Sequence, residues 1–167
     1  MMMTQMQTIW KRIVLWLLIL TMLLLALEPQ SDQPQEHPNG ITFEEVRETI
    51  ENLTIQPVLP NRYPKGTVLE DMILTELYNG TGVDVVFSLK GNSFVFSCSI
   101  YDGPHGTGYY EKNSVDIEVY YVNQIPHYIF PNMDRFMAVW QNGNTENLLC
   151  GDLTESEIKG IIDSIYS

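Results

Sequence analysis

The sequence has little cysteine and little positive charge. It contains two cysteines, and nine lysines and arginines stand against 21 acidic residues, which gives a net charge of −12. Two of the basic residues precede Glu28, so the remainder of the chain is more acidic still. Such a surface repels phosphate backbones and anionic headgroups, and we therefore expect no nucleic-acid partner. A domain of this length can bury a core without a metal or several disulfides.

Signatures of catalysis are also missing. The chain has no Gly-x-Ser-x-Gly elbow and no His-Glu-x-x-His motif. The spacing of Gly103, Gly106 and Gly108 fits no phosphate-binding loop, and no Lys-Ser/Thr pair follows it. We therefore expect no catalytic, cofactor-binding or metal-binding residue, and interpret the chain as a protein that is not an enzyme. The alternative is a cell-envelope enzyme or a secreted protein that acts on wall or lipid components.

A few polar and aromatic side chains are candidates for binding a metal ion or another ligand. His105 lies near Asp102 and Glu111 without a recognisable metal spacing, so the segment 102–108 is interpreted as a plain loop. His127 is interpreted as a packed or surface residue of a strand. The acids Asp116 and Glu118 are expected on a solvated strand face. Aromatic residues would suit a groove for sugar, lipid or peptide, although strand propensity explains them equally well: Tyr109, Tyr110, Tyr120, Tyr121, Tyr128 and Trp140.

The N-terminal region predicts the compartment. Residues 13–27 form an uninterrupted apolar run, preceded by Lys11 and Arg12 and followed by acidic residues. This bias predicts that the N-terminus stays inside the cell and the rest is exported. As a helix the run spans about 22 Å against a hydrocarbon core of about 30 Å, which suits a signal peptide or a short anchor. We expect no lipoprotein, since no cysteine follows the run.

The apolar run is either cleaved off as a signal peptide or retained as a membrane anchor. A cleavage site requires small residues, and here Leu24 and Ala26 make a poor one, so we favour a retained single-pass anchor over secretion after cleavage. The expected organisation is a cytoplasmic N-terminus at 1–12, the anchor or signal segment at 13–27, a flexible Pro- and Gln-rich spacer at 28–41, and an extracytoplasmic domain at 42–167.

The domain is expected to begin and end with a helix. Thr42 and Glu45 form a capping-box pattern ahead of the apolar positions Phe43, Val46, Ile50 and Leu53. Thr154 and Glu157 form a second capping box, ahead of Ile158, Ile161, Ile162 and Ile165. These isoleucines form one ridge, which requires a partner surface.

Between the helices, apolar and polar residues alternate as in strands. The alternation is clearest at 83–89, 94–100 and 115–121, and further strands are expected at 72–78, 126–130, 136–140 and 147–150. One-sided alternation indicates an antiparallel sheet with one covered face. The predicted fold class is therefore α+β: an antiparallel meander of about six or seven strands, with the N- and C-terminal helices packed on one face, behind a single N-terminal membrane-targeting helix.

The order of these parts resembles the bacterial family known as domain of unknown function 4367. The residues that carry the resemblance are LPNRYPKGT at 59–67, VNQIPHYIF at 122–130, AVW at 138–140 and LTESEIKGIIDSI at 153–165. The resemblance implies an extracytoplasmic module of the bacterial cell envelope behind one membrane segment, and it brings no assigned catalytic residue. Some relatives are fused to anti-sigma-factor-like cytoplasmic parts, of which this sequence shows none.

These observations predict a membrane-tethered binding or sensing module without catalysis, attached to the membrane through its N-terminal helix. Its expected partner is an envelope protein or a small ligand. Cys98 and Cys150 leave two alternatives open: a disulfide that closes a loop of about fifty residues, or two separate buried thiols. The spacing alone does not show whether their strands are neighbours.

Overall fold

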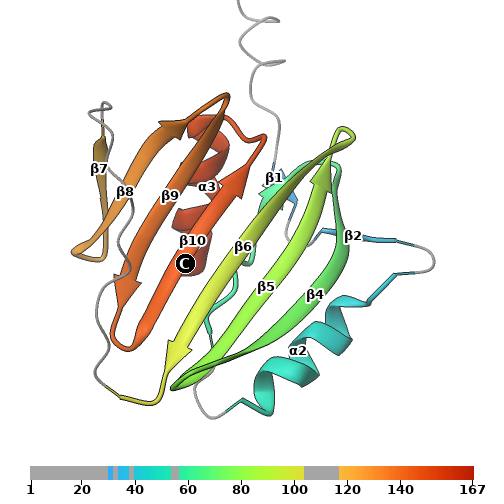
Figure 1. Cartoon of the computed structure of the whole chain (residues 1–167). Coiled ribbons are helices and arrows are strands. Elements are labelled where there is room, and N and C mark those ends of the chain that lie inside the picture. The colour runs from blue at the N-terminus through green and yellow to red at the C-terminus, as the bar shows by residue number, and fades with distance from the viewer. Residues whose placement is uncertain (1–29, 32–33, 38–39, 54–56, 104–116) are drawn as a thin grey trace, which may run out of the picture.

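The computed structural model describes residues 30–31, 34–37, 40–53, 57–103 and 117–167. It contains mostly strands, with two helices (Figure 1). The helices are α2 at Phe43–Glu51 and α3 at Glu155–Ile165. The strands are β1 at Gln30–Ser31, β2 at Gln35–Glu36, β3 at Tyr63–Pro64, β4 at Thr67–Leu77, β5 at Gly80–Leu89, β6 at Asn92–Tyr101, β7 at Glu118–Val122, β8 at Ile125–Asn132, β9 at Arg135–Asn142 and β10 at Thr145–Gly151.

The main sheet has eight strands in the order β2-β4-β5-β6-β10-β9-β8-β7, and β1 and β3 form a separate pair. The predicted antiparallel meander is therefore wrong in its details. Strand β10 lies between β6 and β9, because the chain leaves β6 without making a hairpin and the last strand takes the place beside it. The sheet is mixed, since β2 pairs with β4 in parallel. Part of the expected spacer at 28–41 thus joins the sheet.

Tight turns set the register of three hairpins. Lys90 and Gly91 have φ of 54° and 86° between β5 and β6, and Asn123 and Gln124 have φ of 50° and 67° between β7 and β8. Two consecutive residues with positive φ match the right-handed twist of the strands on either side of them. Gly143, with φ of 59°, lies in the turn between β9 and β10. These are turns that the sequence predicts.

Both capping boxes are confirmed. The Thr42 hydroxyl accepts from the Glu45 amide at 3.2 Å, and the Glu45 carboxylate accepts from the Thr42 amide at 2.7 Å. Thr154 and Glu157 exchange the same pair of bonds at 3.3 and 2.7 Å. Each box satisfies amide groups that the first turn of a helix leaves without intrahelical partners. The two helices therefore start where the sequence predicts.

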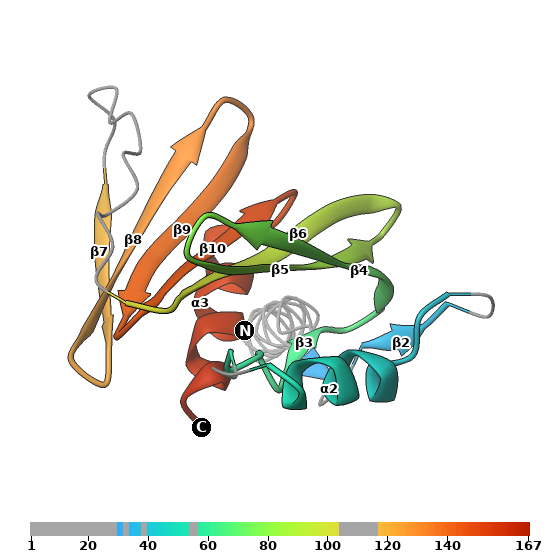
Figure 2. The same ribbon diagram turned by 60° about the horizontal axis from the view of Figure 1, so that its bottom comes forward.

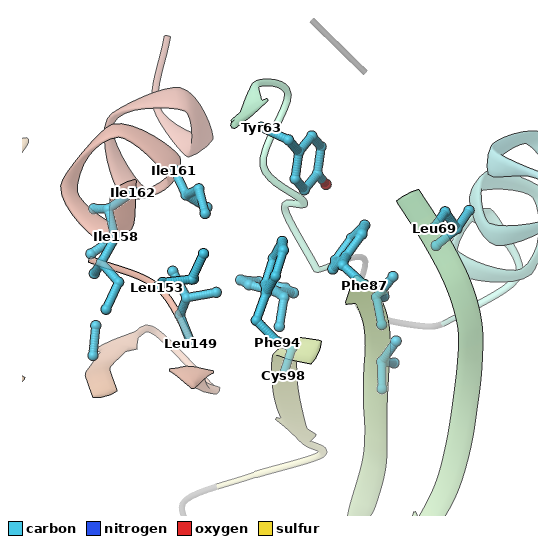
Figure 3. Close-up of a cluster of buried hydrophobic side chains, with 14 of the residues drawn as sticks. Tyr63, Leu69, Phe87, Phe94, Cys98, Leu149, Leu153, Ile158, Ile161 and Ile162 are labelled. Atoms are coloured by element: carbon cyan, nitrogen blue, oxygen red, sulfur yellow. The ribbon is translucent and has the colours of Figure 1, made fainter. Parts of the chain in front are cut away.

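The core lies between the two helices and one face of the sheet (Figure 2). From α3, Ile158, Ile161 and Ile162 point toward β10 and β6, and Tyr63 lies above Phe87 in the middle of the cluster (Figure 3). The rings of Tyr63 and Phe87 lie 4.8 Å apart, and Phe87 stacks on Phe94 at 5.0 Å. Helix α2 contributes Val46 and Ile50 to the same cluster. The predicted packing of both helices on one face thus matches the structure.

One strand presents its faces the other way round from the prediction. Tyr120 and Val122 of β7 pack against the core, whereas Val119 and Tyr121 are 41% and 65% exposed. Glu118 lies on the helix side but is exposed, as predicted, and its carboxylate accepts from the Lys159 ammonium of α3 at 2.8 Å. Strand β7 lies at the sheet edge, where it meets polar side chains of α3, so a polar residue is tolerated on its inner face.

No helix among the described residues is long and apolar enough to cross a membrane. The expected anchor at 13–27, with Lys11 and Arg12, lies outside the described residues, as do His105, Tyr109, Tyr110, Glu111 and Asp116.

Candidate functional site

The second face of the main sheet, which no described helix covers, carries a row of aligned side chains. We call it the open face. Its central row joins residues of neighbouring strands that lie directly opposite each other and therefore share a face. The row runs from β7 to β4 through Val119, Tyr128, Val139, Leu148, Ser97, Asp84 and Ile73. This row is apolar and aromatic from β7 to β10, polar at Ser97 and Asp84, and apolar again at Ile73.

A second row is apolar from β8 to β5 and ends on one polar residue, in β4. It runs from β8 to β4 through Phe130, Met137, Cys150, Val95, Val86 and Asp71. Most of these side chains are half-buried. The outermost apolar positions, Val119, Tyr121 and Ile73, are 41%, 65% and 48% exposed. The two rows together form a continuous surface across seven strands rather than a set of isolated residues.

Carboxylates on the polar side of the open face are held by hydroxyl groups. Ser97 Oγ donates to Asp84 Oδ1, and Ser88 Oγ donates to Glu70 Oε1. Tyr101 donates to Glu146 Oε2 at 3.4 Å. The bonds fix the direction of the carboxylates. The alternation in β5 and β6 does predict which residues point outward, but it does not predict these cross-strand pairs.

A groove of about 330 Å³ lies on the helix side, between α2 and the proline-bearing segment 57–61. Its lining is mostly apolar, with three polar residues: Phe43, Ile50, Pro57, Leu59, Pro60, Arg47, Glu51 and Asn61. The volume is at the lower end for small-molecule pockets. The Arg47 guanidinium is bonded to Glu44 at 2.8 Å on the same helix, so it is already engaged.

His127 lies at the other end of the helix layer. Its ring is fully buried, 5.0 Å from the ring of Trp140 and 5.6 Å from the ring of Tyr166. Burial lowers its pKa from the ordinary value, although hydrogen bonds to two backbone carbonyl groups oppose the shift. The interpretation of His127 as a packed strand residue is confirmed, and its link to α3 is not visible in the sequence.

Metal chemistry has no support among the described residues, which contain no group of three or more His, Cys, Asp or Glu that could hold an ion. Of the loop at 102–108, only Asp102 and Gly103 are described. The Asp102 amide donates to the Asn79 carbonyl at 2.9 Å, a bond that holds Asp102 beside the β4–β5 turn.

The two cysteines lie in neighbouring strands but on opposite faces. Cys98 is paired with Asn147 and points into the core, whereas Cys150 is paired with Val95 and lies on the open face. Both are free thiols in the structure; Cys98 is buried, whereas Cys150 is half-buried. Burial raises the pKa of Cys98 to about 12 and also raises that of Cys150, which Arg135 lowers in part. Neither thiol is therefore a ready nucleophile at neutral pH.

Comparison with known proteins gives one family. The family model described as Domain of unknown function (DUF4367) matches residues 58–165, which is more than half of the chain and includes β3 to α3. No curated protein matches. No solved structure matches. The whole open face lies within the matched segment apart from the short strand β2, whereas α2 and one side of the groove lie outside it.

Proposed function

We propose a function from the premise that this chain belongs to the family described as Domain of unknown function (DUF4367). The protein is proposed to be a membrane-tethered extracytoplasmic module, which binds an envelope protein through the open face of its sheet. The observation that carries the proposal is the pair of side-chain rows across the open face. A continuous, partly exposed apolar surface beside fixed polar groups is typical of an interaction site.

The position of the face supports a macromolecular partner rather than a small ligand. Small molecules bind in concave pockets that bury most of their surface, whereas the open face is a broad sheet surface. The groove beside α2 is concave, but it depends on a helix outside the family segment. A surface built from strands β4 to β10 belongs to the part of the chain that the family shares.

The tether is proposed from the sequence. Lys11 and Arg12 before the apolar run at 13–27 orient the N-terminus inward, so that the domain lies outside the membrane. We also propose that the module binds without catalysing a reaction. The carboxylates of the open face are held by serine and tyrosine hydroxyl groups in a broad surface, whereas glycoside hydrolysis needs a carboxylic acid in a cleft.

Site-specific photocrosslinking tests the binding proposal. A photoreactive residue is placed at Tyr121 or Ile73 of the full-length protein in its native membrane, and at Glu48 on the exposed side of α2 as a matched control. We expect a discrete crosslinked envelope protein from the two open-face positions and not from the control. The double variant Tyr121→Ser, Ile73→Ser should lose the partner with little change in the denaturation midpoint. Equal crosslinking from Glu48, or none from the open face, would refute the proposal.

A further inference from the structure

The buried ring of His127 joins two elements that are far apart in the sequence. It lies on β8, and its neighbour across the hairpin is Tyr120 of β7. From the other side it meets Tyr166, the C-cap residue of α3. The side chain is 0% exposed, so that water does not reach it in the folded state.

The hydrogen bonds of the ring define its tautomer. Nδ1 lies 3.2 Å from the carbonyl oxygen of Tyr120 and 3.0 Å from that of Ile125. Carbonyl oxygen atoms only accept, so Nδ1 carries the hydrogen atom and donates it. The neutral ring then has a lone pair on Nε2, which accepts from the Tyr166 hydroxyl at 3.1 Å. The indole of Trp140 in turn bonds to the same hydroxyl.

We propose that His127 is a pH-dependent lock on the end of α3: protonation of its ring in acid releases Tyr166 and the last turn of the helix from the β7–β8 hairpin. A proton on Nε2 turns the acceptor into a donor. The Tyr166 hydroxyl then meets two donors, His127 and Trp140, and its own hydrogen loses its acceptor. A charge without water in a buried site adds a further cost.

The charged groups around the ring do not compensate for this cost. On α3, the Asp163 carboxylate raises the pKa of His127, but it already accepts from the Tyr120 hydroxyl at 2.7 Å. The Lys159 ammonium is held by Glu118 of β7 at 2.8 Å and by Glu155 at 2.6 Å. Burial is the largest influence, and the net shift of the His127 pKa is downward.

The sign of the pH effect follows from this shift. Because the folded state holds the His127 pKa below its ordinary value of about 6.5, the opened state binds more protons at pH values between the two. The lock therefore contributes its full stabilisation at pH values above the ordinary His pKa, and this contribution decreases as the pH falls below that value. Movement of Tyr166 away from the ring removes the mismatched hydrogen bond and admits water, which solvates the charge on His127.

The release is expected to be local. The isoleucine ridge of α3, Ile158, Ile161 and Ile162, is fully buried in the core and contains no titratable group. Apart from His127, the helix end bonds to the segment at Asn61 and Arg62: Ser164 Oγ donates to the Arg62 carbonyl at 3.2 Å, and Asn61 Nδ2 donates to Ser167 Oγ at 3.3 Å. Acid should therefore open the segment after Asp163 while the sheet and the start of α3 stay in place.

Hydrogen exchange and NMR on the full-length protein in detergent micelles test the lock. Amide protection of residues 163–167 and 120–127 is compared at about pH 7.5 and about pH 5, after correction for the intrinsic pH dependence of exchange, while the ring protons of His127 are titrated. We expect these segments to lose protection in step with protonation of His127, and residues 94–100 of β6 to keep theirs.

Two variants complete the design. His127→Asn keeps a donor close to the position of Nδ1 but cannot be protonated in this range, so it should remove the pH response. His37→Gln, in the segment before α2, is the matched control and should leave the response unchanged. If His127→Asn does not fold, the wild-type titration decides the question. An unchanged response in His127→Asn, or full protection of residues 163–167 while the His127 ring is protonated, would overturn the proposal.

Discussion

At the scale of single residues, the opposite faces of Cys98 and Cys150 explain why a plausible disulfide does not form. Neighbouring strands bring the two residues within three positions of register, because Cys98 is opposite Asn147 and Cys150 is opposite Val95. Side chains that are an odd number of positions apart point to opposite sides of a sheet. A disulfide requires the two Cβ atoms to face each other, so the sheet itself separates these thiols.

The cysteines give the first prediction. Purified protein that is unfolded without reductant and treated with a thiol-labelling reagent should take up two labels per chain, as measured by mass spectrometry. Folded protein should react more slowly at Cys98 than at Cys150, since Cys98 is buried and its thiol has the more strongly raised pKa. Labelling of the unfolded chain only after reduction would contradict this arrangement.

The sequence predicts the residues of this site only in part. The alternation in β5 and β6 indicates which side chains point inward, and Cys98 among Phe94, Phe96 and Ile100 is buried as predicted. The alternation gives the wrong inward face for β7, because Tyr120, rather than Val119 or Tyr121, packs against the core. His127 needs Tyr166 as a partner, and no local pattern relates residues 39 positions apart.

At the scale of elements, the final helix is where local sequence and tertiary structure agree best. Its capping box fixes the start, and its isoleucine spacing places Ile158, Ile161 and Ile162 in the core. The strands are less well defined by sequence. Periodicity locates each of them, but the order of the sheet depends on long-range pairing, and nothing local places β10 between β6 and β9.

Truncation of the helix ridge gives the second prediction. Ile161→Ala should lower the free energy of unfolding by about 2–5 kcal/mol, because the lost methyl groups leave a cavity among packed side chains. Chemical denaturation followed by circular dichroism measures the change. Ser156→Ala, at an exposed position of the same helix, is the control and should shift the midpoint little. No shift for Ile161→Ala would mean that α3 does not dock on the sheet.

At the scale of the whole molecule, the architecture is asymmetric. Both helices lie on one face of the main sheet (Figure 2). The two side-chain rows lie on the other face. The family segment at 58–165 contains the strands that form those rows. A surface that is built from the shared core of a family and directed away from its helix layer is well placed for an interaction. The acidic balance of the chain beyond residue 28 also disfavours polyanionic partners.

The proposal of a binding module without catalysis is the third prediction. Purified full-length protein should show no turnover when it is screened against cell-envelope substrates such as peptidoglycan fragments, wall polymers and lipid-linked precursors. If a preparation shows activity, the variants Asp84→Asn, Glu146→Gln and His127→Asn distinguish activity of this chain from that of a contaminant. Turnover that one of these substitutions abolishes in a folded protein would show that the chain is an enzyme.

The orientation of the chain in the membrane is the central claim, since the partner class and the exposure of His127 to external pH both depend on it. The most direct measurement places one epitope tag at the N-terminus and another after Ser167, and treats intact cells with protease. The account predicts that the C-terminal tag is lost while the N-terminal tag survives, and that lysis exposes both. Survival of the C-terminal tag on intact cells, with loss after lysis, would contradict it.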